Sequence, residues 1–322
     1  MISVHPVTIA RDNHRPTRLA KQTAGHTQLP SRFSCLGTMG EGGMGLVQFA
    51  LDGNNGQTPV VIKRALRTDF NPHFANEAIT LFTLPESPHL PQLIDHGLHN
   101  GTYWLAMPYI DGELLADRLD KGPLSLPESL KIVTQAAAGL AEANNSGILH
   151  RDLKPDNIMI GSNGITQVID FGVAHVDQPG DLVGTVGYIS PEQITDNDTI
   201  DCRSDIYSLG TIFYEMITGQ PAFKLNRTAP ILEQILTARH YASLGVPHLN
   251  QISLDLKEGG VQSLTQEFAS KMTALDRADR YSNYQEVIAA AQGIGNRLAA
   301  FTREMDHEME LLRQATSRPR AE

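Results

Sequence analysis

The sequence predicts an α+β domain that is large enough to form two lobes around one cleft. Residues 33–290 alternate apolar stretches with glycine and proline, a pattern typical of mixed domains. With 322 residues, of which 41% are hydrophobic and 19% charged, the chain can bury a sizeable core. A β-branched run at residues 60–62 follows a glycine-rich segment and predicts a strand next to a hairpin.

Composition and charge disfavour several classes of protein. A formal net charge of -10 argues against a nucleic-acid partner, because phosphate contacts need a basic face. Cys35 and Cys202 lack the spacing of a disulfide framework or a zinc site, so we expect two reduced thiols. No 18 consecutive residues are apolar, so we expect no membrane span. These observations favour a globular, cytoplasmic protein.

The first segment, residues 1–32, is basic. It holds five Lys and Arg residues against the single acid Asp12 and shows no apolar period. It lacks the apolar stretch of a secretory signal. We therefore expect a disordered basic arm; a transport signal of another kind, and with it delivery into another cell, stays open as the alternative.

Residues 150–157 read His-Arg-Asp-Leu-Lys-Pro-Asp-Asn, and residues 170–172 read Asp-Phe-Gly. Asp152 offers a proton acceptor in the first motif. Asn157 and Asp170 offer the hard oxygen ligands that Mg²⁺ prefers. The two motifs, in this order and with Asn157 five residues after Asp152, predict a site for phosphoryl transfer.

A glycine-rich segment with the pattern GxGxxGxV precedes the predicted strand. Glycines allow backbone N–H groups to approach phosphate oxygens without obstruction by Cβ. The strand ends in Lys63, whose charge needs a carboxylate partner, and the resemblance named below implies Glu77, in the helical stretch that follows, for that role. Glu86 is a poorer candidate because prolines flank it. The segment's pattern residues are Gly40, Gly42, Gly43, Gly45 and Val47.

Together these motifs resemble the eukaryotic-like Ser/Thr protein kinases of bacteria, over about residues 33–290. The resemblance implies a bilobal protein-kinase fold. Residues 33–110 would form a small β-rich lobe with one main helix, and residues 111–291 a larger, mostly helical lobe. The implied cofactors are ATP and Mg²⁺, with Mn²⁺ as an alternative metal, and the implied substrates are Ser and Thr hydroxyls of proteins.

The resemblance also assigns roles to individual residues. Asp152 would be the catalytic base, and Asn157 and Asp170 would hold Mg²⁺. Lys154 would neutralise the γ-phosphate, and a lysine at that position goes with Ser/Thr rather than Tyr substrates in this family. Thr185 would hydrogen-bond the base and the lysine.

The expected nucleotide contacts lie on the small lobe and the hinge. Lys63 would bind the α- and β-phosphates, with Glu77 as its partner. Met107 would be the gatekeeper beside adenine, Pro108 would offer its carbonyl and Ile110 its N–H, so a proline without N–H loses nothing at that position. Ile62, with Ala50, is expected to contact the base, although a core position would explain both equally well.

Several residues of the large lobe are expected to have structural roles. Asp205 would anchor the loop from a buried helix, and Glu192 would form a buried ion pair with Arg280. His150 and Phe171 are predicted to be structural, in an apolar stack with Leu81.

The segment between Gly172 and Thr185 contains no Ser, Thr or Tyr. Arg151 marks the class of kinases in which a phosphorylated loop residue pairs with this arginine. We therefore expect Asp177 or Asp181 to supply a permanent carboxylate, so that the enzyme is active without loop phosphorylation. The alternative is that both acids face solvent.

From residue 292 to 322 we expect an amphipathic C-terminal helix or tail. Its apolar stripe either packs on the large lobe or mediates self-association or partner binding and regulates the enzyme. The stripe residues recur at three- and four-residue steps and are Leu298, Phe301, Met305, Met309 and Leu312.

Two other functions stay open at this point. A pseudokinase that binds nucleotide and acts as a scaffold for a partner would keep the fold, but it usually loses the lysine, the base or a metal ligand, and none is lost here. A small-molecule kinase is disfavoured by Ser190-Pro191-Glu192, which resembles the Ala-Pro-Glu end of the docking segment in protein kinases.

Overall fold

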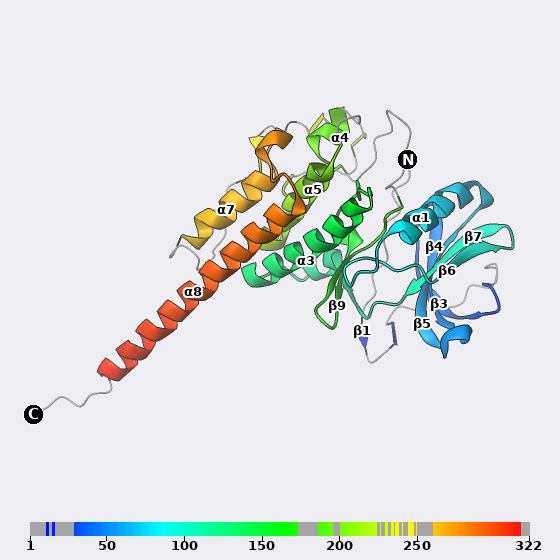
Figure 1. The fold of residues 1–322 in the computed structure, drawn as a ribbon, viewed down its shortest axis with the longest axis horizontal. Helices are drawn as coiled ribbons and strands as arrows, with labels where there is room; N and C mark the ends of the chain where they lie inside the picture. Colours follow the sequence, from blue (N-terminus) through cyan, green and yellow to red (C-terminus); the bar gives the residue numbers. More distant parts are fainter. Residues whose placement is uncertain are drawn as a thin grey trace, which may run out of the picture.

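The computed structural model describes residues 29–172, 186–195, 200–223 and 260–316, scattered positions between 226 and 249, and two short paired strands near the start of the chain. The strands are β1 (Arg11–Asp12) and β2 (Arg15–Pro16). A β-sheet with one helix forms the first part, and a cluster of helices forms the second (Figure 1). The predicted α+β class is confirmed.

One antiparallel sheet of five strands, in the order β3-β4-β5-β7-β6, forms the small lobe. Helix α1 (Asn71–Thr83) packs against it through Phe74, Ala78 and Leu81, which recur at helical spacing and are buried. The strands are β3 (Phe33–Glu41), β4 (Gly45–Asp52), β5 (Thr58–Ala65), β6 (Asp95–His99) and β7 (Thr102–Pro108).

In the described part of the chain, the longer helices of the large lobe are α3 (Leu126–Asn145), α5 (Cys202–Thr218), α7 (Val261–Met272) and the first half of α8 (Tyr284–Thr316). Helix α3 starts at Ser125, whose side chain accepts the N–H of Glu128 as an N-cap. Helix α5 starts at Asp201, which accepts the N–H of Arg203 in the same way. The large lobe and its junction with the small lobe also contain short elements: β8 (Gly112–Leu114), α2 (Leu115–Leu119), β9 (Ile158–Gly161), β10 (Thr166–Val168) and α4 (Pro191–Thr195).

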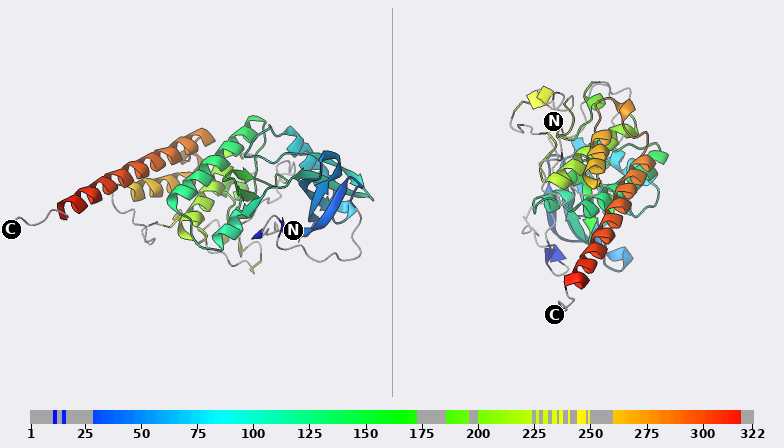
Figure 2. Two further views of the ribbon diagram at one scale, coloured as in Figure 1. Left: turned by 90° about the horizontal axis from the view of Figure 1, so that it is seen from below. Right: turned by 90° about the vertical axis from the view of Figure 1, so that its left-hand side faces the viewer.

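Helix α8 belongs to the large lobe at its start and leaves it toward its end. The helix that we expected from residue 292 is the distal part of α8, which begins eight residues earlier. Tyr284, Val287, Ala291 and Ile294 are buried against the lobe. Beyond them the helix runs past α3 and α7 (Figures 1 and 2).

Within the described ranges, no helix combines the length and apolar character needed to cross a membrane.

Candidate active site

Lys63 joins three separate elements of the chain. Its Nζ donates to Glu77 Oε1 at 2.7 Å and to Asp170 Oδ1 at 2.9 Å. Lys63 lies on β5, Glu77 on α1, and Asp170 follows β10. The predicted partner of Lys63 is therefore Glu77, whereas Glu86 is exposed beyond the end of α1.

The charges of this triad shift one another's pKa values. Burial alone would lower the pKa of Lys63, but the two carboxylates outweigh it and raise that pKa. Burial would likewise raise the pKa of Asp170, but Lys63 outweighs it and lowers that pKa. Glu77 is the more deeply buried acid, and burial raises its pKa. Lys63 thus balances the charge of both carboxylates, and Lys154 adds positive charge that also lowers the pKa of Asp170.

The glycine-rich segment forms the hairpin between β3 and β4. The N–H of Gly42 donates to the carbonyl of Gly45 at 2.8 Å, with Gly43 inside the turn, and Gly40 pairs with Val47. A Cβ on Gly45 would lie 2.5 Å from Cζ of Phe74. Glycine is therefore required at this position for α1 to pack so closely against the hairpin.

The register of β4, β5 and β7 decides which side chains share the face of Lys63. Val47 lies directly opposite Lys63, and Val61 lies opposite Met107. Side chains alternate between the two faces of a strand, and directly opposed residues share one face. Val47, Val61, Lys63 and Met107 therefore line one face of the sheet.

Ile62 lies on the other face of the sheet. It is fully buried with Ala50, Phe33 and Trp104 in a second hydrophobic cluster. The expected contact of Ile62 with the base is therefore corrected: alternation along β5 directs Ile62 away from Lys63 and gives Val61 the matching position. Pro108 ends β7, and Ile110 follows in the hinge before β8.

Asp152 is held in the loop that follows α3. Lys154 Nζ donates to Asp152 Oδ2 at 2.8 Å, and both side chains are largely buried. Asn157 Nδ2 donates to the carbonyl of Asp152 at 2.8 Å. The three predicted residues of this loop are thus brought together.

Asp205, on α5, anchors this loop through its side-chain carboxylate. Its Oδ2 accepts the N–H of His150 and its Oδ1 the N–H of Arg151, both at 2.9 Å. The expected anchoring role of Asp205 is confirmed. Tyr284, which sequence reasoning missed, donates its hydroxyl to the same carboxylate at 3.1 Å. No motif marks Tyr284 in the sequence.

Two site residues have left-handed backbone conformations. Arg151 has φ 63° and Asp170 has φ 64°. Such conformations are uncommon for residues with a Cβ and often occur at functional sites, where neighbouring groups hold them. Arg151 directly precedes Asp152, the predicted base, and Asp170 is itself a predicted metal ligand.

An apolar stack joins the two motifs to the small lobe. His150 and Phe171 have ring centroids 4.8 Å apart, and His150 Nε2 lies 3.0 Å from the carbonyl of Ile169. Phe171 belongs to the same buried cluster as Leu81 of α1. The predicted structural role of these residues is confirmed.

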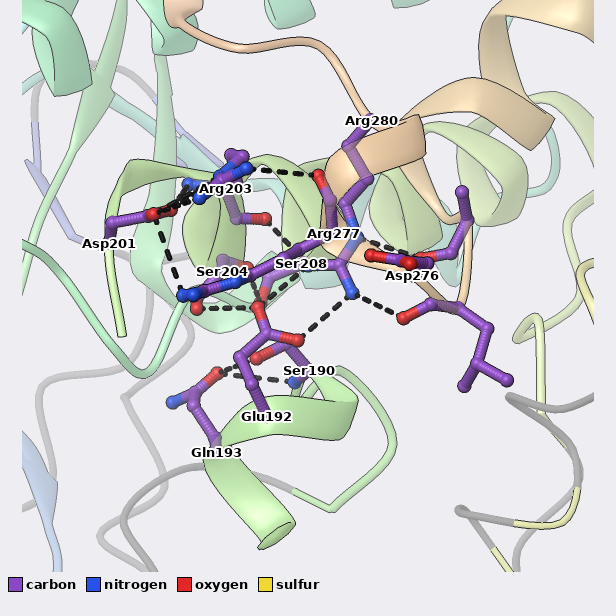
Figure 3. Close-up of polar contacts among 12 residues, drawn as sticks. Ser190, Glu192, Gln193, Asp201, Arg203, Ser204, Ser208, Asp276, Arg277 and Arg280 are labelled. Atoms are coloured by element: carbon purple, nitrogen blue, oxygen red, sulfur yellow. Dashed lines mark hydrogen bonds and ion pairs between the residues drawn. The ribbon is translucent and has the colours of Figure 1, made fainter. Parts of the chain in front are cut away.

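A polar cluster lies in the large lobe, where α4, α5 and the segment before α8 meet (Figure 3). Arg280 donates to the two carboxylate oxygens of Glu192 at 2.7 and 2.9 Å, as predicted. Ser204 also donates to Glu192, at 2.7 Å. Thr185, Asp177 and Asp181 lie outside the described residues.

Residues 33–291 match the protein kinase domain model. The chain belongs to the protein kinase family. This kinase is 30% identical over 272 residues to serine/threonine-protein kinase PknD of Mycobacterium tuberculosis, covering 80% of this chain and 39% of PknD. It is 35% identical over 214 residues to serine/threonine-protein kinase PknB of Mycolicibacterium smegmatis, covering 61% of this chain and 34% of PknB.

A protein of Bifidobacterium longum named "Probable serine/threonine-protein kinase PknB" is 32% identical over 270 residues, covering 77% of this chain and 37% of the relative. The kinase thus spans between 34% and 39% of the length of these three relatives. The predicted resemblance to bacterial Ser/Thr kinases is confirmed.

Proposed function

We propose that this kinase transfers the γ-phosphoryl group of ATP to Ser and Thr hydroxyls of proteins. The observation that carries the proposal is the double hydrogen bond of Lys63 to Glu77 and Asp170. It assembles the small lobe, its helix and the Asp-Phe-Gly motif in the arrangement that phosphoryl transfer requires. The names of the bacterial relatives support Ser and Thr as acceptors, and a cytoplasmic location is part of the proposal.

ATP would bind along the face of the sheet that carries Lys63. Lys63 would contact the α- and β-phosphates, and Val47, Val61 and Met107 would contact the base. The carbonyl of Pro108 and the N–H of Ile110 would hydrogen-bond adenine. The phosphates would lie under the backbone of the hairpin glycines Gly40, Gly42, Gly43 and Gly45.

Asp152 would accept the proton of the substrate hydroxyl while the hydroxyl oxygen attacks the γ-phosphorus and the bond to the β-phosphate oxygen breaks. Lys154, bound to Asp152 Oδ2, would offset the charge of the phosphoryl group during transfer. Thr185 would hydrogen-bond both residues. In these roles Asp152 and Lys154 would both lie on the side of the phosphoryl group that faces the substrate hydroxyl.

Asn157 and Asp170 would hold Mg²⁺, or Mn²⁺ in its place. Asn157 Nδ2 is bound to the Asp152 carbonyl, whereas Asn157 Oδ1 is buried and has no hydrogen-bond partner in the described part of the chain. A buried oxygen of this kind is unfavourable unless a ligand satisfies it. Held by Asn157 and Asp170, the ion would supply the positive charge that offsets the phosphate charge.

We also propose that the kinase is active without loop phosphorylation. The segment after Gly172 has no hydroxyl residue before Thr185, and Asp177 or Asp181 would serve as the carboxylate for Arg151. If Asp177→Asn and Asp181→Asn, alone and combined, leave the rate of the unphosphorylated enzyme unchanged, this part of the proposal fails.

The distal part of α8 is proposed as a surface for self-association or a regulatory partner. Leu298 packs against the main cluster, whereas Met309 and Leu312 have exposed fractions of 48% and 55%. Light scattering of the wild type and of Met309→Glu/Leu312→Glu would test self-association. A monomeric wild type would rule out self-association.

The proposed function is tested by transfer from labelled ATP and Mg²⁺ to a generic protein substrate and to the kinase itself. The wild type should transfer phosphate to Ser or Thr, and Asp152→Asn and Lys63→Met should not. Asp156→Asn, one residue from Asn157, is the matched control for the charge change. Magnesium-dependent ATP binding without transfer by the wild type would instead favour the pseudokinase scaffold.

A further inference from the structure

We propose that Gln193 is a positioning residue that holds residue 151 in its left-handed conformation and so presents Asp152 to the substrate. The proposal deepens the kinase function above and rests on it. Gln193 lies on α4, 42 residues from Arg151 in sequence, and is itself buried.

Hydrogen bonds reach the Gln193 amide from two directions. Its Oε1 accepts the N–H of Ser190 at 3.1 Å and the hydroxyl of Ser190 at 3.0 Å (Figure 3). Its Nε2 donates to the carbonyl of Arg151 at 2.8 Å. A backbone N–H can only donate and a carbonyl can only accept, so these partners permit one orientation of the amide.

The peptide groups on both sides of the Arg151 Cα are thereby fixed. Asp205 accepts the Arg151 N–H at 2.9 Å, and Gln193 binds the Arg151 carbonyl. With its N–H and its C=O bound to two different helices, residue 151 is held at φ 63°. Without such support, a residue with a Cβ would populate this conformation roughly tenfold less than the right-handed one.

The next residue in the chain is Asp152, so the direction of the Arg151 carbonyl sets where the Asp152 backbone begins. Asp152 N donates to the carbonyl of His150 at 2.9 Å, and the Asp152 carbonyl accepts from Asn157. A rotation of the peptide between residues 151 and 152 would disturb both the base and the proposed metal ligand. Gln193 therefore acts on catalysis through the backbone and touches no reacting atom.

Ser190 gives a reason for the departure from alanine in the Ala-Pro-Glu pattern. Its hydroxyl is the second donor to Gln193 Oε1, beside its own backbone N–H. Ser190 is fully buried, so this hydroxyl needs a partner within the protein. Ser190 thus strengthens the amide orientation that directs Nε2 to Arg151.

A double-mutant cycle tests the proposal. Arg151→Gly and Arg151→Ala both remove the guanidinium group, but only glycine adopts a positive φ readily. Gln193→Met is added to each. With alanine at 151 we expect Gln193→Met to lower kcat about tenfold, the population ratio given above, and with glycine less than about twofold, while KM for ATP stays constant.

The loss of stability caused by Gln193→Met should be larger with glycine at 151 than with alanine, the reverse of the order expected for kcat. With alanine at 151, loss of Gln193 lets the backbone relax, so the denaturation midpoint should fall less than it does with glycine at 151. If Gln193 had a purely structural role, Gln193→Met would lower kcat by the same factor in the two backgrounds and would lower the denaturation midpoint by the same amount in both. Gln292→Met, an exposed glutamine on α8, is the matched control and should change neither.

Equal effects of Gln193→Met on kcat in the two backgrounds would overturn the positioning role. Equal shifts of the denaturation midpoint would overturn the backbone clamp itself. The denaturation measurements need no activity, so they judge the clamp even if the wild type transfers no phosphate and the kinase proposal fails.

Discussion

Glu192 and Arg280 lie 88 residues apart in sequence and form two hydrogen bonds, at 2.7 and 2.9 Å, while the Arg280 side chain is completely excluded from solvent. Arg280 also donates to the backbone carbonyls of Ala274 and Arg203. The pair thus ties the helix that ends the docking segment to α5 and to the turn before α8.

Removing one partner of this ion pair should destabilise the kinase strongly. Glu192→Ala leaves the Arg280 charge buried without its carboxylate, and we expect the free energy of unfolding to fall by about 3–5 kcal/mol. Urea denaturation measures the change. Glu310→Ala, which breaks an exposed contact with Arg313, is the control and should leave stability unchanged. A similar loss in both variants would contradict the prediction.

The same pair predicts a dependence of stability on pH. Burial would raise the pKa of Glu192, but hydrogen bonds and charge from Arg280 outweigh it and lower the pKa below its ordinary value of 4.5. The folded form therefore binds this proton less readily than the unfolded chain, so the contribution is complete above pH 4.5 and is lost as pH falls through the lower value in the folded state. Wild type and Glu192→Gln should converge in stability as the pH is lowered. A constant difference between pH 7 and pH 3 would be inconsistent with this.

Glu77→Gln should impair catalysis, although the new side chain has nearly the same shape as the old one. Glutamine cannot balance the charge of Lys63, so Lys63 would be held by Asp170 alone, and we expect kcat/KM for ATP to fall about 10- to 100-fold. Glu86→Gln makes the same change at an exposed acid and should leave the kinetics intact. Steady-state assays with varied ATP distinguish the two. An equal loss in both variants would argue that Lys63 needs no particular partner.

Tyr284→Phe should loosen the anchor of the catalytic loop. The hydroxyl donates to the buried Asp205, and its removal should lower the free energy of unfolding by about 1 kcal/mol. Because Asp205 also orients His150 and Arg151, kcat should fall while KM for ATP is retained. Unchanged kcat together with reduced stability would show that Asp205 orients the loop unaided.

Two truncations separate the halves of α8. A chain that ends after Ala300 keeps Tyr284, Ile294 and Leu298 and should unfold at the wild-type midpoint. A chain that ends at residue 292 loses the apolar contacts of Ile294 and Leu298, and we expect a loss of about 2–4 kcal/mol. Thermal denaturation measures both. Comparing the activity of the two forms then shows whether the distal half regulates the enzyme.

Local motifs predicted most of the site because their residues have fixed neighbours along the chain. The loop from His150 to Asn157 carries its own hydrogen bonds, so its roles could be read from spacing. Lys63 and Glu77 lie on different elements, and only the family pattern joined them. Ile62 was misplaced because sequence alone did not show which face of β5 meets the nucleotide.

Contacts between distant elements could not be predicted in this way. Tyr284 reaches Asp205 across 79 residues, and Gln193 reaches Arg151 across 42. Tyrosine and glutamine at these positions have no distinctive spacing. Their roles depend on how α4, α5 and α8 pack, which is decided by the buried apolar residues of the whole lobe.

Gly45 of the hairpin and Phe74 of α1 pack directly against each other. Phe74 occupies the space that a Cβ at residue 45 would need, and Lys63 Nζ lies 5.8 Å from the centre of its ring. An outward swing of α1 would pull Glu77 from Lys63 and at the same time withdraw the support beneath the hairpin. The position of α1 therefore bears on two parts of the site, the hairpin expected to cover the phosphates and the hydrogen bond of Lys63 to Glu77.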